Sequence, residues 1–207
     1  MSTDSKRPIP WLRIAFLLGI TVTLWWLAQP SHGHVHEKTH YQKATSNCRQ
    51  IVSAMKLWAE DHDGAFPDGA TANAAFRQLI QDDVIQDERI FGCPTSPYNG
   101  DNNLGEPPEF HEAVAVNENH WMMIAGVTEK SPDLTPVVFE NALSTILPLT
   151  WGPERKGLQV RGSTWTGGKI VIGFKDGSVA LVDITRPDHP LAHLPPGTRV
   201  LDIETTP

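Results

Sequence analysis

The sequence predicts an α+β fold in which one long N-terminal helix packs on a small antiparallel β-sheet. Two features indicate the helix. They are an apolar run from Trp11 to Ala28 and a following segment, residues 37–61, whose apolar residues recur every three or four positions. The third observation is a set of short, β-rich segments confined to the second half of the chain. Helices first and strands afterwards favour an antiparallel sheet.

The apolar run of residues 11–28 has the composition of a membrane span. Its 18 residues reach about 27 Å, close to the roughly 30 Å of a hydrocarbon core when tryptophans lie in the interfaces. Lys6, Arg7 and Arg13 precede or begin it, so the N-terminus is expected in the cytoplasm. The prediction is a single-pass protein of the inner membrane. A cleaved secretory signal, cut near Ser31–Gly33, is the alternative.

These features divide the chain into four parts. They are a cytoplasmic N-terminus (1–10), a transmembrane helix (11–28), an exported domain (29–187) and a Pro-rich C-terminal tail (188–207) that is expected to be loosely attached. The formal net charge of −7 repels phosphate backbones, so nucleic acid is not expected as a partner.

The apolar stripe of residues 37–61 predicts an amphipathic helix that continues the span as one rod. Gly64 and Pro67 end it, near Asp63. Thr71 is a candidate N-cap for a shorter helix that runs to about Gln81.

The second half of the chain begins with turn-forming residues and then turns to strands. Residues 93–108 predict a long surface loop. Strands are expected at 120–126, 135–140, 169–174 and 179–184, and Asp176–Gly177 predicts a hairpin between the last two.

Cys48 and Cys93 are the two cysteines of the chain. If the domain is exported, both lie where disulfides persist, and a Cys48–Cys93 disulfide is expected. Two buried apolar thiols are the alternative.

Several segments, in order, resemble the bacterial type IV pilins and type II secretion pseudopilins, over most of the chain from Thr39 to Ile184. The segment Cys48–Ile51 with Trp58–Pro67 is similar to the end of their N-terminal helix. The further similar segments are their cysteine–proline segment, their middle strands and their final hairpin, here Ile90–Pro94, Ile124–Thr128, Pro136–Glu140 and Ile170–Val182.

The resemblance implies a non-enzymatic, membrane-anchored structural or interaction protein of a secretion or cell-envelope assembly, with other such proteins as partners. The chain departs from the family in two ways. Residues 6–17 lack the prepilin peptidase site and the glutamate used in fibre assembly, so a pilus is not implied. Ser178 and Thr166 stand where the family's hairpin carries histidines.

A histidine-rich segment offers a second hypothesis. His32, His34, His36 and His40 are candidate ligands for a divalent metal. Within them His36-Glu37-Lys38-Thr39-His40 matches H-E-x-x-H, and Glu60 follows His40 by 20 residues, the spacing of a third zinc ligand. The segment from Tyr41 to Asp61 has no helix breaker, however, so Glu60 is expected roughly 30 Å from His40 along the same helix. The alternative function is therefore a membrane-tethered metal-binding protein or zinc metallopeptidase.

Other sites of chemistry are weakly indicated. The acidic loop Asp101–Asn103 offers oxygen ligands for calcium without an EF-hand pattern. No G-x-S-x-G, Rossmann glycine fingerprint or C-x-x-C is present, and no organic cofactor is expected.

Overall fold

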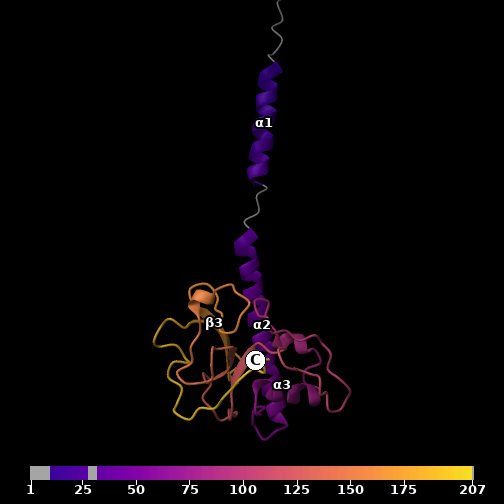
Figure 1. Ribbon diagram of the computed structural model, residues 1–207, viewed down its shortest axis with the longest axis vertical. Coiled ribbons are helices and arrows are strands. Elements are labelled where there is room, and N and C mark those ends of the chain that lie inside the picture. The colour runs from indigo at the N-terminus through magenta and orange to yellow at the C-terminus, as the bar shows by residue number, and fades with distance from the viewer. Residues whose placement is uncertain (1–9, 28–31, 207) are drawn as a thin grey trace, which may run out of the picture. The chain divides into compact units, whose positions relative to one another are not determined.

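The computed structural model describes residues 10–27 and 32–206. The chain divides into two compact units between Lys38 and Thr39. The first unit contains α1 (Pro10–Leu27) and the beginning of α2 (His32–Glu60), shown in indigo in Figure 1. Along α1, apolar side chains such as Trp11, Phe16 and Trp25 are exposed.

The predicted architecture of one long N-terminal helix on a small sheet is wrong. The structure has α1 and α2 as separate elements, and residues 28–31, where the predicted rod was continuous, lie outside the described residues. Of the helices in the described ranges, none combines the length and the apolar character needed to cross a membrane. The predicted transmembrane helix is therefore wrong, and the single-pass inner-membrane location that depended on it is not supported.

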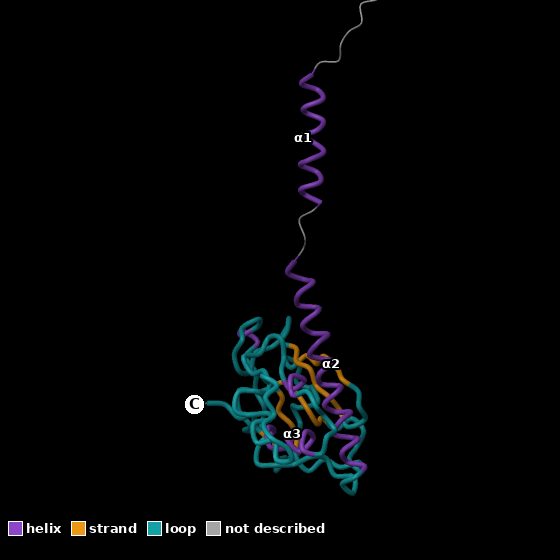
Figure 2. The backbone as a smooth tube through the Cα atoms, turned by 90° about the vertical axis from the view of Figure 1, so that its right-hand side faces the viewer, coloured by secondary structure: helices purple, strands orange, loops and turns teal. Residues whose placement is uncertain are grey.

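The second unit combines helices with a five-stranded antiparallel sheet. After α2 come α3 (Ala72–Gln81), a 3-10 helix η1 (Glu88–Phe91) and, late in the chain, a second one, η2 (Pro153–Arg155). The strands are β1 (Trp121–Ile124), β2 (Pro136–Glu140), β3 (Lys169–Phe174), β4 (Val179–Asp183) and β5 (Val200–Leu201), in the order β4-β3-β2-β1-β5. Figure 2 shows α2 running alongside the strands, with loops making up much of this unit.

Local sequence signals account for several of these elements. The Thr71 hydroxyl accepts a hydrogen bond from the Ala74 amide, which caps α3 as predicted. In the β3–β4 hairpin, Gly177 has a φ of +95°, and the Asp176 carboxylate accepts bonds from the amide and hydroxyl of Ser178. The antiparallel pairing of β3 with β4 confirms the predicted hairpin. Glycine suits the turn because it adopts a positive φ at no steric cost.

A glycine in β3 lets α2 pack closely on the sheet. A Cβ atom at Gly173 would lie 2.6 Å from a methyl carbon of Val52 and 2.8 Å from the Cys48 sulfur, both on α2. The absence of a side chain at Gly173 therefore sets how near the helix lies to β3. The fully buried core side chains on either side include Ile51, Met55 and Ile172.

The C-terminal segment is packed, and the expectation that it is loosely attached is wrong. Val200 and Leu201 pair with β1, and Leu191, Leu201 and Ile203 are buried. Asn73 of α3 ties the end of the segment down, because its Oδ1 accepts a 3.0 Å hydrogen bond from the Glu204 amide.

The two cysteines are free thiols, so the predicted Cys48–Cys93 disulfide is wrong. Both are buried, as in the alternative of two buried thiols, but their environments differ. The Cys48 sulfur packs against Gly173 of β3, whereas the Cys93 sulfur lies beside His120 and Glu140. Burial raises the pKa of the Cys48 thiol well above its ordinary value, and the charge of Glu140 raises it further.

Candidate functional site

Three chemically reactive side chains meet in the core of the second unit. Cys93 follows η1, His120 precedes β1, and Glu140 ends β2. The antiparallel register of β1 and β2 places Trp121 opposite Glu140, which brings His120 beside that carboxylate. The His120 amide donates a 2.8 Å hydrogen bond to the Phe91 carbonyl, and this bond holds the segment leading to Cys93 against the start of β1.

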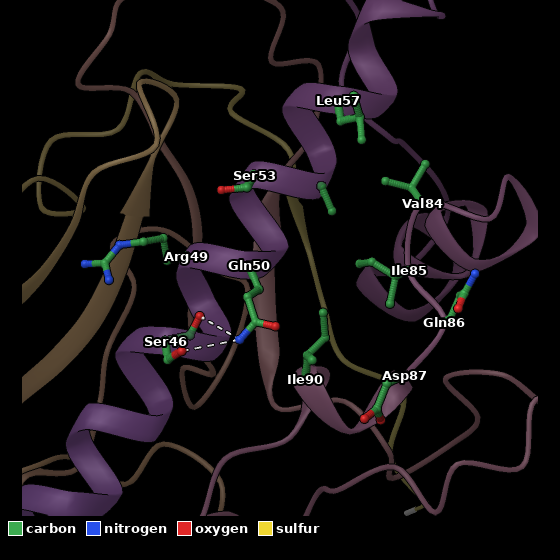
Figure 3. A pocket seen from close by; sticks show the side chains of 11 residues that line it. Ser46, Arg49, Gln50, Ser53, Leu57, Val84, Ile85, Gln86, Asp87 and Ile90 are labelled. Carbon is green, nitrogen blue, oxygen red and sulfur yellow. Dashed lines mark hydrogen bonds between the residues drawn. The ribbon is translucent and has the colours of Figure 1, made fainter.

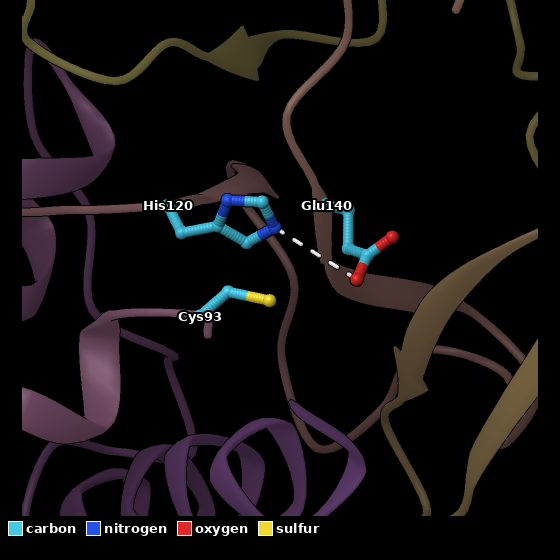
Figure 4. Close-up of side chains that lie close together, drawn as sticks. All are labelled: Cys93, His120 and Glu140. Atoms are coloured by element: carbon cyan, nitrogen blue, oxygen red, sulfur yellow. Dashed lines mark ion pairs between the residues drawn. The ribbon is translucent and has the colours of Figure 1, made fainter. Parts of the chain in front are cut away.

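These side chains point toward one another, as Figure 4 shows. One donor atom from each residue lies within 4.8 Å of the other two: the Cys93 sulfur, a His120 ring nitrogen and a Glu140 carboxylate oxygen. The distance from His120 Nε2 to Glu140 Oε1 is 3.8 Å. Only 1 % of Cys93, 4 % of His120 and 2 % of Glu140 is exposed. We call these three residues the Cys–His–Glu cluster.

Hydrogen bonds from the surroundings fix the cluster. The Trp165 indole N–H donates to Glu140 Oε1 at 2.7 Å. The Asn141 amide nitrogen lies 2.9 Å from His120 Nδ1 and donates to the His120 carbonyl, while Asn141 Oδ1 accepts from the Gly162 amide. Because the Gly162 N–H can only donate, the Asn141 amide is oriented with its NH₂ group toward Nδ1. Nδ1 is then an acceptor, and the ring proton lies on Nε2.

His120 Nε2 has no hydrogen-bond partner although it is buried. Burial lowers the pKa of His120, but Cys93 and Glu140 raise it more, to about 10. A positive charge is therefore favoured between the sulfur and the carboxylate. The ring can carry that charge only with a proton on Nδ1 as well, and the Asn141 NH₂ group opposes this.

A separate acidic cluster involves the predicted calcium loop. Oxygens of Glu88, Asp101 and Glu118 lie within 4.8 Å of one another. The buried Glu88 carboxylate accepts hydrogen bonds from the Asn102 amide at 2.6 Å and the Val114 amide at 2.7 Å. Burial raises the pKa of both Glu88 and Glu118, and the charge of Asp101 adds to this. These hydrogen bonds give the cluster a structural role, because the Glu88 carboxylate joins the loop at Asn102 to the loop at Val114.

The histidines predicted to bind metal lie on α2. His32, His34, His36 and His40 all fall within its residue range, in the first third of the helix. The side chains of His32, His34 and His36 are outside the described part of the structure, and His40 is half-buried. The metal site at these histidines stays a prediction. Glu60 is at the far end of the same continuous helix, about 30 Å from His40, so it cannot complete an H-E-x-x-H zinc site.

An open groove of about 590 Å³ lies between α2 and residues 84–90. Figure 3 shows α2 as one wall, with Arg49, Gln50 and Leu57 on it. The other wall carries Val84, Ile85, Gln86, Asp87 and Ile90. Leu57 is 54 % exposed on the wall of the groove.

The groove and the Cys–His–Glu cluster are separate. None of three clefts, this groove and those beside His189 and Asp176, is lined by Cys93, His120 or Glu140. Sequence reasoning singled out Cys93 only as a disulfide partner. The one signal for Glu140 was its place at the end of the apolar run Pro136–Phe139.

Comparisons of this chain with protein-family models, with curated proteins and with solved structures find no match, and the resemblance to pseudopilins therefore stays a prediction.

Proposed function

We propose that this protein acts by protein–protein contact, as a non-enzymatic, pseudopilin-like subunit of a secretion or cell-envelope assembly. The observation that carries the proposal is the groove between α2 and residues 84–90, which exposes apolar side chains from both walls. An open apolar groove of this kind is typical of a docking surface, because water leaves such a surface when a partner binds.

The shape of the groove indicates the kind of partner. Ser46, Gln50, Ser53 and Leu57 form one stripe of α2 facing the groove, and the stripe covers twelve residues, or about 18 Å of helix axis. A stripe of this length accommodates about three turns of a second helix. We infer that an amphipathic helix of a partner subunit lies in the groove, with apolar side chains spaced three and four residues apart.

The charges beside the groove add to its specificity. Arg49 is exposed on α2, while Asp87 on the opposite wall already pairs with Arg89 at 2.7 Å. Of the described residues that line the groove, Arg49 is the one basic residue, and Figure 3 shows its side chain extending away from Val84 and Ile85, so it can meet a carboxylate of the partner helix at the rim of the groove. The sequence motifs that resemble pseudopilins, which assemble through their helices, support the same function.

The proposal is tested by placing a photo-reactive amino acid in the groove. Full-length protein carrying p-benzoyl-phenylalanine at Leu57 is irradiated in the producing cells, and Leu134, which is 70 % exposed, serves as the control position. The expected result is one discrete protein adduct at Leu57 that is absent at Leu134. The peptide cross-linked at Leu57, identified by mass spectrometry, should be an amphipathic helix.

A second variant links the adduct to the groove chemistry. Arg49→Glu, introduced together with the photo-reactive residue at Leu57, should reduce the adduct at least about 10-fold, because it reverses the charge that meets the partner. Val84→Asp places a charge on the opposite wall of the groove and should also reduce the yield of the adduct. Equal cross-linking from Leu57 and Leu134, or an adduct yield that neither Arg49→Glu nor Val84→Asp changes, would contradict the proposed function.

A further inference from the structure

We propose that Cys93, His120 and Glu140 form a buried binding site for zinc or another thiophilic divalent metal ion. Thiolate, imidazole and carboxylate are the three donor types that zinc binds in proteins. Each of the three residues supplies one donor atom, and these atoms lie within 4.8 Å of one another. This site is distinct from the histidines of α2 and from the docking groove.

The geometry suits a tetrahedral ion. For bonds of about 2.0–2.3 Å, tetrahedral donors lie roughly 3.4–3.6 Å apart. The distance between His120 Nε2 and Glu140 Oε1 is 3.8 Å, which needs a movement of a few tenths of an ångström, and the distances from these atoms to the Cys93 sulfur are at most 4.8 Å. The remaining coordination position would be filled by a water molecule or by the Thr95 hydroxyl, which lies 3.4 Å from the Cys93 sulfur.

An unpartnered atom points into the site. His120 is 4 % exposed, and its Nε2 has no hydrogen-bond partner. A buried polar atom without a partner is destabilising, and a metal bond at Nε2 removes that cost. The charges of the ligands are a second reason to expect a divalent ion. Among the ion pairs of the described residues, Glu140 has only His120 as a partner. A divalent ion balances one thiolate and one carboxylate.

Coordination of a metal through Nε2 changes the hydrogen bond between His120 and Asn141. The proton of a metal-bound imidazole moves to Nδ1, which needs an acceptor. The Asn141 NH₂ group now faces Nδ1 at 2.9 Å, so the amide must turn its oxygen to the ring when the metal binds and give up its bonds to the Gly162 amide and the His120 carbonyl. Replacing Asn141 with aspartate supplies a carboxylate acceptor in the same place. Asn141→Asp is therefore expected to bind the metal about 10-fold more tightly than the wild type.

The test uses cobalt as the probe, because a cobalt–thiolate bond gives a charge-transfer band in the near ultraviolet. Full-length protein is unfolded with chelator and refolded with Co²⁺, since a buried site fills during folding. The expected result is about one Co²⁺ per chain with a sulfur band. Cys93→Ala should remove the band and weaken binding about 100-fold or more. Cys48→Ala, the matched control at the other buried thiol, should keep it.

The outcomes separate this site from its alternatives. Cobalt on the histidines of α2 has no sulfur ligand, so binding without a sulfur band in the wild type overturns the proposal. Loss of the band in Cys48→Ala but not in Cys93→Ala overturns it as well. If Cys93→Ala does not fold, the band of the wild type and its retention in Cys48→Ala decide the question, and the affinity of Asn141→Asp provides a second readout.

Discussion

Replacing Gly173 with alanine should destabilise the protein, because α2 crosses β3 at this residue. The added Cβ atom would lie 2.6 Å from a methyl carbon of Val52 and 2.8 Å from the Cys48 sulfur. Both distances are well below the roughly 3.5–4.0 Å of an optimal carbon contact. Val52 and Cys48 are fully buried, so neither side chain has open space into which it can move.

The expected loss follows from these two overlaps. Overpacking of a dense core by one methyl group costs about 1–3 kcal/mol, and two simultaneous overlaps place this case near the upper end. Alanine also restricts the unfolded chain, which offsets about 0.4–1 kcal/mol. The net loss in the free energy of unfolding is therefore about 2 kcal/mol.

Urea denaturation of the full chain measures this loss, with Cys48→Ala combined with Gly173→Ala in a double-mutant cycle. Cys48→Ala removes the sulfur that the new methyl group meets, so the double mutant should recover about 1 kcal/mol relative to additivity. A Gly173→Ala variant within about 0.5 kcal/mol of the wild type, or a coupling energy near zero, would refute the close packing of α2 on β3.

Two further predictions concern the loops around α3. Asp101→Asn should make stability fall less with rising pH. The folded-state pKa values of Glu88 and Glu118 are raised above 4.5. The stability that these two carboxyl groups contribute is therefore present below pH 4.5 and is lost as the pH rises through their folded-state pKa values. Asp101→Asn removes one negative charge that raises both pKa values. Urea midpoints at pH 4 and 7 measure the difference, and parallel curves for variant and wild type would contradict it. Asn73→Ala should cost about 3 kcal/mol, because the buried amide bonds the Val114 carbonyl and the Glu204 amide. A loss below about 1 kcal/mol in urea would show that the amide does not hold the C-terminal segment.

The elements that were predictable from the sequence are those set by local chemistry. The Thr71 cap, the Asp176–Gly177 hairpin and the positions of β1 to β4 each depend on residues within a few positions of one another. In contrast, β5 is two residues long and forms only because β1 offers it an edge. A Pro-rich segment carries no period that reveals such a pairing, and the prediction of a loosely attached tail failed for that reason.

The Cys–His–Glu cluster was not predictable for a related reason. Cys93, His120 and Glu140 lie in separate segments with no motif spacing. Their meeting depends on the β1–β2 register and on the bond from His120 to Phe91. The disulfide prediction failed because a sequence gives the number of thiols but not their directions. The predicted fold of one long helix on a small sheet failed because apolar patterning indicates helical segments but not how many separate elements they form.

One segment, residues 84–93, contributes to both proposed sites. Ile90 lines the groove, and Cys93 follows it by three residues. Asn47 of α2 donates a 3.1 Å hydrogen bond to the Gly92 carbonyl between them, so the helix that forms one wall also holds the Cys93 backbone. A variant at Ile90 would therefore disturb both sites at once.

Leu57 and Cys93 separate the two sites, because Leu57 lines only the groove and Cys93 lies only in the cluster. Leu57→Asp should weaken partner binding and leave the cobalt–sulfur band unchanged, whereas Cys93→Ala should remove the band and leave the Leu57 cross-link in place. A loss of both properties in either variant would mean that the groove and the cluster form one coupled site, and the two functions would then have to be assigned together.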